Sequence, residues 1–131
     1  MAPSQRFRMT ILAAPKDGVS QEEFSTYLKE KHAPLFLSIA ISKRNLLKYE
    51  QFHVDTTLTT ALNASADWHE SGSAQPKFWS LAILEAESPE KILEIFKDEE
   101  YLRVVAPDES VVCNRAGSYI LAGHYVTLFE A

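Results

Sequence analysis

The side chains best suited to moving a proton in this sequence are His32, Tyr49 and His53. His32 lies where a predicted helix ends, and the negative end of a helix dipole favours a protonated imidazole. It can therefore act as a general acid or hold a carboxylate, although the same ring can simply cap the last helix carbonyls. Tyr49 and His53 are four residues apart on a predicted strand, so they share one face, roughly 13 Å apart.

Gln51 lies between Tyr49 and His53 on that face. If the face lines a pocket, it presents an amide, a phenol and an imidazole to one ligand, and we favour this interpretation. The alternative is that the face packs against helices. Tyr49 is then a packing residue and His53 a buried imidazole with its hydrogen bonds satisfied.

Two further residues complete the candidate catalytic set. Asp108 follows Pro107 and can orient a histidine as a helper carboxylate, or it can cap a turn. His124 follows Gly123 in the predicted last strand, where a position at a pocket rim or a dimer contact is the alternative role. His69 is expected to be an exposed loop residue.

Aromatic side chains provide the candidate binding surface. Most aromatic residues pack in cores or interfaces, but a few can stack on a flat ligand, because π faces and apolar walls suit polycyclic phenols. Arg8 or Lys77 can pair with a substrate carboxylate. Together with Gln51, the candidate binding residues are Phe78, Trp79, Trp68 and Tyr119.

The sequence lacks the usual motifs of metal and nucleotide sites. Its four histidines are spread singly, without H-x-x-x-H or C-x-x-C spacing, and G-x-G-x-x-G, Walker and G-x-S-x-G motifs are absent. Cys113 is the single cysteine, which excludes an internal disulfide. It follows two valines and is interpreted as a half-buried structural thiol. We therefore expect no metal and no cofactor.

Composition favours one α+β domain over residues 1–131, because this length and a content of 46% hydrophobic and 24% charged residues are typical of a globular domain. The net charge of -5 and the scattered basic residues argue against nucleic acid and anionic membranes as partners. No apolar stretch reaches the roughly 18 to 20 residues of a membrane span. The start of the sequence has no apolar core of a signal peptide, so the cytoplasm is the expected location.

Apolar periodicity predicts the elements that position these side chains. A capping box at Ser20 starts a first helix, which Pro34 ends near His32. Ser88-Pro89 starts a second helix, and a further helical turn at Tyr101–Val105 ends at Pro107. The predicted strands are Arg6–Ala14, Leu46–Asp55, Phe78–Ala86 and Ser118–Phe129.

Three details of this assignment bear on the fold. Phe78–Ala86 is nearly all apolar and is therefore predicted to be central in the sheet. Gly123 is predicted to be a bulge or a point of close approach. The first half of Thr56–Gln75 can form a short helix, and Ser71–Ser73 is a predicted loop.

The element order, strand–helix–strand twice, predicts a ferredoxin-like βαβ–βαβ plait with a four-stranded antiparallel sheet. Helices cover only one face of such a sheet. The other face carries apolar residues, so we expect a second copy or a ligand pocket to cover it.

Three motifs in this sequence resemble those of the EthD-like proteins, a family of the dimeric α+β barrel superfamily. The resemblance spans roughly residues 6–129 and is greatest to fungal members of aromatic polyketide pathways, described as decarboxylases or dehydratases. It departs from the family at Phe78-Trp79-Ser80, where Phe-Asp-Gly is usual, and in residues 56–75. The motifs are Ser20-x-x-Glu23-Phe24-x-x-Tyr27 leading to His32-Ala33-Pro34-Leu35, then Lys48-Tyr49-x-Gln51-x-His53, then Pro107-Asp108-Glu109.

The resemblance implies a homodimeric, cofactor-independent lyase that decarboxylates an aromatic polyketide carboxylic acid in secondary metabolism. A histidine acid, a tyrosine hydrogen bond and a dry apolar pocket suffice for this reaction. Dehydration or cyclisation needs nearly the same groups, so the reaction is left open among them. A non-catalytic carrier and a cofactor-free monooxygenase are the alternatives from other functional classes.

Overall fold

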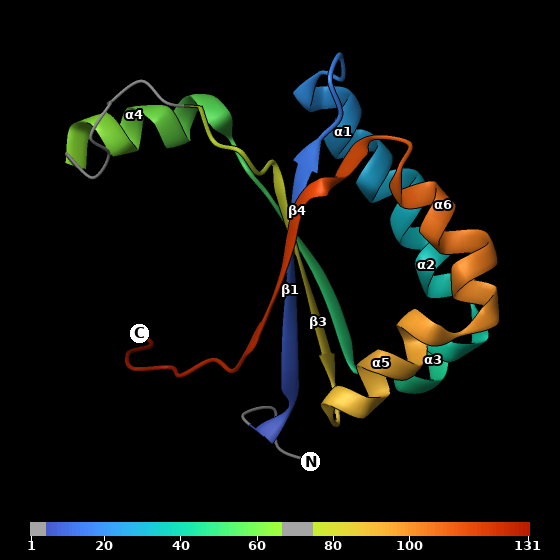
Figure 1. The fold of residues 1–131 in the computed structure, drawn as a ribbon. Coiled ribbons are helices and arrows are strands. Elements are labelled where there is room, and N and C mark those ends of the chain that lie inside the picture. Colours follow the sequence, from blue (N-terminus) through green and yellow to red (C-terminus); the bar gives the residue numbers. More distant parts are fainter. Residues whose placement is uncertain (1–4, 67–74) are drawn as a thin grey trace.

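The computed structural model describes residues 5–66 and 75–131. Four strands form one antiparallel sheet in the order β2-β3-β1-β4. This confirms the predicted α+β fold, and β3 lies in the centre of the sheet as expected (Figure 1). The strands are β1 (Phe7–Pro15), β2 (Lys48–His53), β3 (Ser80–Ala86) and β4 (Cys113–Gly123).

Two runs of helix cover one face of the sheet (Figure 1). The first run follows β1 and the second joins β3 to β4. Ser20 and Ser88 cap the two runs, each accepting a hydrogen bond from the backbone N–H three residues on, which confirms the predicted helix starts. The first run comprises α1 (Gln21–Tyr27), η2 (Leu28–His32), α2 (Ala33–Ser38) and α3 (Ala40–Asn45), and the second α5 (Pro89–Lys97), η3 (Tyr101–Val105) and α6 (Ala106–Glu109).

The prediction that Pro34 and Pro107 end their helices is wrong. Each helix first widens into a π-helical turn, η2 or η3, and then continues through the proline as an α-helix. The backbone N–H of Ala33 donates to the carbonyl of Leu28, five residues earlier. A wider turn relieves the clash between a proline ring and the carbonyl four residues before it, so the helix survives.

The predicted end of the last strand is also wrong. β4 begins at Cys113 and ends at Gly123, which pairs with Arg8 near the start of β1. Beyond this point only Phe7 of β1 remains. The register shift lies instead opposite Leu12 to Ala14, between Asn114 and Tyr119 of β4, so Gly123 is not the bulge.

The helix predicted at the start of residues 56–75 is present as α4 (Thr56–Ala66). It has no buried residue and projects from the side of the sheet that the other helices leave open (Figure 1). The predicted loop at Ser71–Ser73 and the candidates Trp68 and His69 lie outside the described residues.

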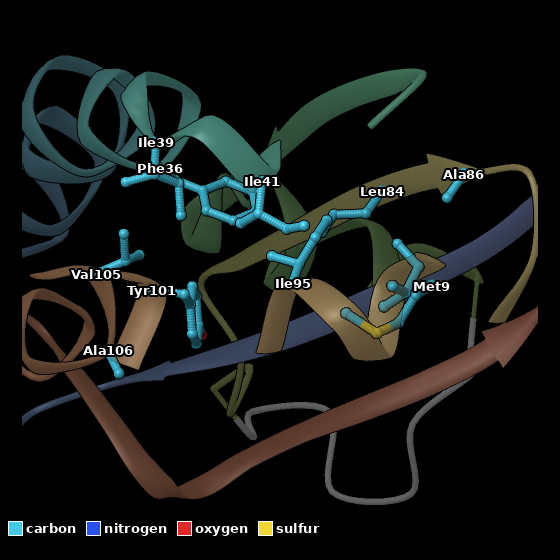
Figure 2. Close-up of a cluster of buried hydrophobic side chains, with 11 residues drawn as sticks. Met9, Phe36, Ile39, Ile41, Leu84, Ala86, Ile95, Tyr101, Val105 and Ala106 are labelled. Atoms are coloured by element: carbon cyan, nitrogen blue, oxygen red, sulfur yellow. The ribbon is translucent and has the colours of Figure 1, made fainter. Parts of the chain in front are cut away.

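The main core lies between the sheet and the helices, where Met9 and Leu84 from the strands meet Phe36, Ile95 and Tyr101 from the helices (Figure 2). A second cluster at the other end of the sheet contains Ala13, Phe24, Leu28 and Val112. Within the described residues, no helix combines the length and apolarity needed to cross a membrane.

Candidate functional site

A cavity of about 210 Å³ lies between the sheet and the helices. Its polar lining includes His32, Tyr49 and Gln51, whereas Ile11, Ala82 and Leu84 belong to its apolar wall. This cavity is on the helix-covered face, not on the open face where we expected a pocket. The strand face that carries Tyr49 therefore both packs on helices and lines a hollow, which combines the two interpretations of the sequence.

A hydrogen-bonded contact at the cavity wall joins the two βαβ halves. His32, at the end of η2, is 9% exposed, and its Nδ1 lies 2.9 Å from Oδ2 of Asp108 on α6. The Tyr27 hydroxyl donates to the other oxygen of the same carboxylate, Oδ1. This bond, followed by desolvation, raises the pKa of Tyr27 to about 12, so the phenol stays protonated and remains a donor.

Asp108 thus contacts a histidine, which is the contact that an orienting carboxylate would make. Its contact with Nδ1 leaves Nε2 as the nitrogen of His32 that a ligand can reach, and the carboxylate stabilises the ring when it carries a proton. The expected contribution of a helix C-terminus is absent, because the helix continues past His32 into α2. The partner of the His32 ring is therefore a carboxylate and not the end of a helix.

The two π-helical turns bring this pair together. In η2 and in η3, the turn is followed directly by an Ala-Pro dipeptide, Ala33-Pro34 in one half and Ala106-Pro107 in the other. π-helical turns are rare and often occur at functional sites. The repeated Ala-Pro was the visible signal in the sequence, and it marks the two junctions across which the His32–Asp108 contact forms.

A hydrogen-bonded chain runs along β2 to the cavity. Gln51 Nε2 donates to Tyr49 Oη and to the carbonyl of Leu28, both at 3.0 Å. His53 Nε2 lies 2.8 Å from Gln51 Oε1, and its Nδ1 lies 2.6 Å from Ser25 Oγ. Burial, and then the charge of Lys29, lowers the pKa of His53, whereas burial raises the pKa of Tyr49.

A second carboxylate completes the polar wall. Tyr101 Oη donates to Glu109 Oε2 at 2.5 Å, and Arg115 Nε lies 3.6 Å from Glu109 Oε1. Burial is the main cause that raises the pKa of Tyr101, with Glu109 adding to it. Arg115 lines the cavity, and its side chain is 62% exposed, which fits a position at the rim.

Five contributors to this wall and its hydrogen bonds were missed in the sequence: Ser25, Tyr27, Tyr101, Glu109 and Arg115. Cys113 also lines the cavity. Burial, with help from nearby carboxylates, raises its pKa from 9.0 to about 11, so it is a thiol and a poor nucleophile at neutral pH. In the described part of the chain, no three His, Cys, Asp or Glu side chains gather as a metal site would require.

Of the other predicted catalytic residues, His53 and His124 do not line the cavity. His53 reaches it only through Gln51, and so has its hydrogen bonds satisfied as in the alternative interpretation. His124 is exposed in the segment that follows β4, because the sheet ends one residue earlier.

The predicted binding residues divide in the same way. Tyr119 lines the cavity and packs edge-on against Phe78, which does not line it, at a centroid distance of 5.8 Å. Trp79 packs edge-on against Phe24 in the second core cluster. Neither Arg8 nor Lys77 belongs to the lining; Arg8 instead pairs with Glu85 on the open face of the sheet.

The comparisons with known proteins agree with this fold. The sequence model of the EthD domain matches residues 16–113, more than half of the 131 residues. No curated protein matches the sequence.

Several solved structures share the architecture. A crystal structure of an EthD family protein from Bacillus halodurans C-125 has a TM-score of 0.60 at 12% identity, covering 92% of this chain and 99% of that one. Hydroxynitrile lyase from Passiflora edulis also has a TM-score of 0.60, at 16% identity, covering 98% of this chain and 100% of the lyase. The solution structure of a hypothetical Arabidopsis thaliana protein has a TM-score of 0.58 at 12% identity, with coverages of 99% and 96%.

Proposed function

This chain belongs to the EthD domain family, and we propose that its cavity is the active site of a cofactor-independent lyase that decarboxylates an aromatic polyketide carboxylic acid. The observation that carries this proposal is the His32–Asp108 pair. His32 is buried and lines a mostly apolar cavity that Tyr49 also lines, and Asp108 contacts its Nδ1. A histidine oriented by a carboxylate is a general acid–base device. The substrate class comes from the sequence resemblance to fungal polyketide pathway members.

The proposed reaction breaks the bond between the carboxylate carbon and the carbon that bears it. The electron pair of this bond moves to the carbon skeleton as CO2 leaves, and protonated His32 delivers a proton from Nε2 to the carbonyl oxygen or the ring carbon. Asp108 stabilises the imidazolium until transfer. Tyr49 offers a hydrogen bond to the oxygen on which negative charge develops.

The surroundings of the pair suit an acid as substrate. Arg115 at the rim provides a positive charge that attracts a carboxylate. Deeper in the cavity, Ile11, Ala82 and Leu84 provide apolar walls. Such walls strip water from a bound carboxylate, and this desolvation favours the loss of neutral CO2.

Dehydration is the second candidate, and cyclisation uses the same groups. The Passiflora edulis neighbour is a hydroxynitrile lyase, which favours a lyase reaction on this scaffold in general rather than decarboxylation in particular. In dehydration, neutral His32 takes an α proton and an acid protonates the leaving hydroxyl. A carrier would use the cavity without needing His32, and a cofactor-free monooxygenase would add oxygen to its substrate.

The test is mass spectrometry of the purified protein incubated with an aromatic polyketide acid. Loss of CO2 supports the decarboxylase, loss of water supports the dehydratase, and a gain of oxygen indicates a monooxygenase. We expect His32→Ala and Asp108→Asn to lower turnover by about 10²- to 10⁴-fold, because they remove the acid or its orienting partner.

His124→Ala is the matched control, since it removes an imidazole that is exposed and does not line the cavity. Turnover of His124→Ala should equal that of the original protein. Full turnover in His32→Ala would rule out the proposed mechanism, and ligand binding without any turnover in the original protein would leave the carrier.

We also propose that the protein works as a homodimer whose open sheet faces pack together. The face opposite the helices exposes Phe52 and Leu121, at 59% and 57% of their full surface. Exposed apolar residues grouped on one sheet face are typical of a protein interface.

A further inference from the structure

We propose that Gln51 and His53 are positioning residues that hold the Tyr49 hydroxyl as a hydrogen-bond donor to the ligand, so that the cavity selects ligands with a carbonyl or enolate oxygen. The inference rests on the proposed function, because it gives Tyr49 one defined role in the same cavity. It revises the expected role of His53 from acid–base catalyst to support.

The orientation of the Gln51 amide follows from the partner that it meets on η2. The carbonyl oxygen of Leu28 can only accept a hydrogen bond, so the atom of Gln51 that lies 3.0 Å away must be the nitrogen. An amide nitrogen carries two hydrogens, and the second one is donated to Tyr49 Oη. The amide oxygen is therefore directed at His53.

His53 completes this constraint from the other side. Because Gln51 Oε1 accepts, His53 Nε2 carries a hydrogen. In the neutral ring, Nδ1 then accepts from the hydroxyl of Ser25. Protonation of the ring leaves the Nε2–H donor in place, so Gln51 keeps its orientation in either charge state of His53.

The consequence for Tyr49 is a defined direction of donation. Its oxygen already accepts from Gln51, and among the described residues no acceptor takes its own hydrogen. The ring is held against Phe36 at a centroid distance of 5.3 Å, and the residue lines the cavity. A ligand oxygen that accepts, such as that of a ketone, quinone or enolate, matches this donor, whereas a hydrocarbon does not.

The experiment measures binding, by calorimetry, of two probes of similar shape, 2-acetylnaphthalene and 2-ethylnaphthalene. Only the first has an oxygen that accepts a hydrogen bond. We expect the original protein to bind the ketone about tenfold more tightly, the usual order for one net hydrogen bond. Tyr49→Phe should bind both probes equally.

Gln51→Glu provides the signature that a purely structural role would not give. Above the usual carboxyl pKa the new carboxylate accepts from Tyr49 and diverts its hydrogen, so the tenfold preference should vanish at about pH 8. At about pH 3.5, below that pKa, a protonated carboxyl can again donate to Tyr49, and the preference should return. The titratable and charged groups around position 51 come from four parts of the fold. They are Tyr49 and His53 on β2, Lys29 and His32 on η2, Tyr101 and Glu109 on the second helical run, and Cys113 and Arg115 on β4.

Glu50→Gln is the matched control, since Glu50 neighbours Gln51 but lies on the opposite face of β2. It should keep the ketone preference at both pH values. A ketone preference that survives in Gln51→Glu at pH 8, or an equal loss of affinity for both probes, would overturn the proposal.

His53→Ala tests the other end of the chain and does not depend on whether Gln51→Glu folds. Without the His53 donor the amide is free to turn, so the ketone preference should fall while affinity for the hydrocarbon stays constant. An unchanged ketone preference would show that His53 is not needed to hold the Gln51 amide in its orientation. Neither assay needs turnover, so the two proposals can fail separately. A ketone preference in a protein with no lyase activity would refute the proposed reaction and leave the role of Tyr49 intact.

Discussion

At the scale of single residues, the chemistry of the cavity depends on which ionisable groups are held neutral. Tyr27 and Tyr101 each donate to a carboxylate, and Cys113 lies half-buried near the same carboxylates. The pKa values of all three groups are raised. At neutral pH Tyr27 and Tyr101 therefore stay protonated and keep their hydrogen bonds to the carboxylates, and Cys113 is an unreactive thiol.

These raised pKa values predict a loss of stability in alkaline solution. The pKa of Cys113 rises from 9.0 to about 11 on folding, so the unfolded chain releases this proton at lower pH than the folded one. The contribution of protonated Cys113 to the free energy of unfolding is fully present below about pH 9 and is lost as the pH rises toward 11. A series of thermal melts should show Tm decreasing over this interval.

Cys113→Ala should reduce the fall of Tm between about pH 9 and pH 11, whatever its effect on Tm at neutral pH. Tyr27→Phe should reduce the fall of Tm above about pH 10, since the pKa of Tyr27 rises from 10.0 to about 12. A Tm of the original protein that stays constant up to pH 11 would contradict the raised pKa values of Cys113 and Tyr27.

At the scale of elements, the π-helical turns decide where the His32–Asp108 pair lies. In a regular α-helix the residue after Ala33 would donate to the carbonyl of Glu30, but Pro34 has no N–H, and its ring would clash with that carbonyl. The wider turn η2 resolves the conflict and leaves His32 facing Asp108. Proline here sets the register of the helix instead of ending it.

Pro34→Ala should therefore separate activity from stability. Alanine restores the missing donor and favours helix, so the turn can relax to α geometry and rotate His32 away from Asp108. We expect turnover to drop by about tenfold or more, since small displacements of catalytic groups are costly, while Tm stays equal or rises. Kinetics and thermal melts on the same preparation check this, and unchanged turnover would show that the π-helical turn does not depend on proline.

At the scale of the whole molecule, the two faces of the sheet differ in what covers them. The helix-covered face packs around the core (Figure 2), and the cavity also lies on this side of the sheet. The other face carries the exposed Phe52 and Leu121, and α4 projects beside it without a buried residue (Figure 1). A helix of 11 residues is marginal in isolation, so it needs a packing partner.

Phe52→Asp should weaken the proposed homodimer. A charge in the centre of an apolar interface is costly to desolvate, so sedimentation should shift from twice the chain mass of 14.8 kDa toward that mass. Leu102→Asp is the control, because Leu102 is similarly exposed, at 54%, but lies on η3 among the helices. A single-chain mass for the original protein would refute the dimer.

Local rules were sufficient for much of the fold. The capping serines at Ser20 and Ser88 act through hydrogen bonds to the third residue on, and strand alternation has a period of two, so both are readable over a few residues. The order of these elements then predicted the plait and its central third strand. The sequence also offered Asp108 as a possible partner of a histidine, but it did not indicate that this histidine is His32.

Tertiary structure alone decided the site. His32 and Asp108 are 76 positions apart, and Tyr27 and Asp108 are 81 apart, so no local pattern could pair them. The same holds for His53, whose partners Ser25 and Gln51 satisfy its ring outside the cavity. Periodicity shows which residues share a face, but only packing between the two βαβ halves determines which face closes around a hollow and which side chains meet inside it.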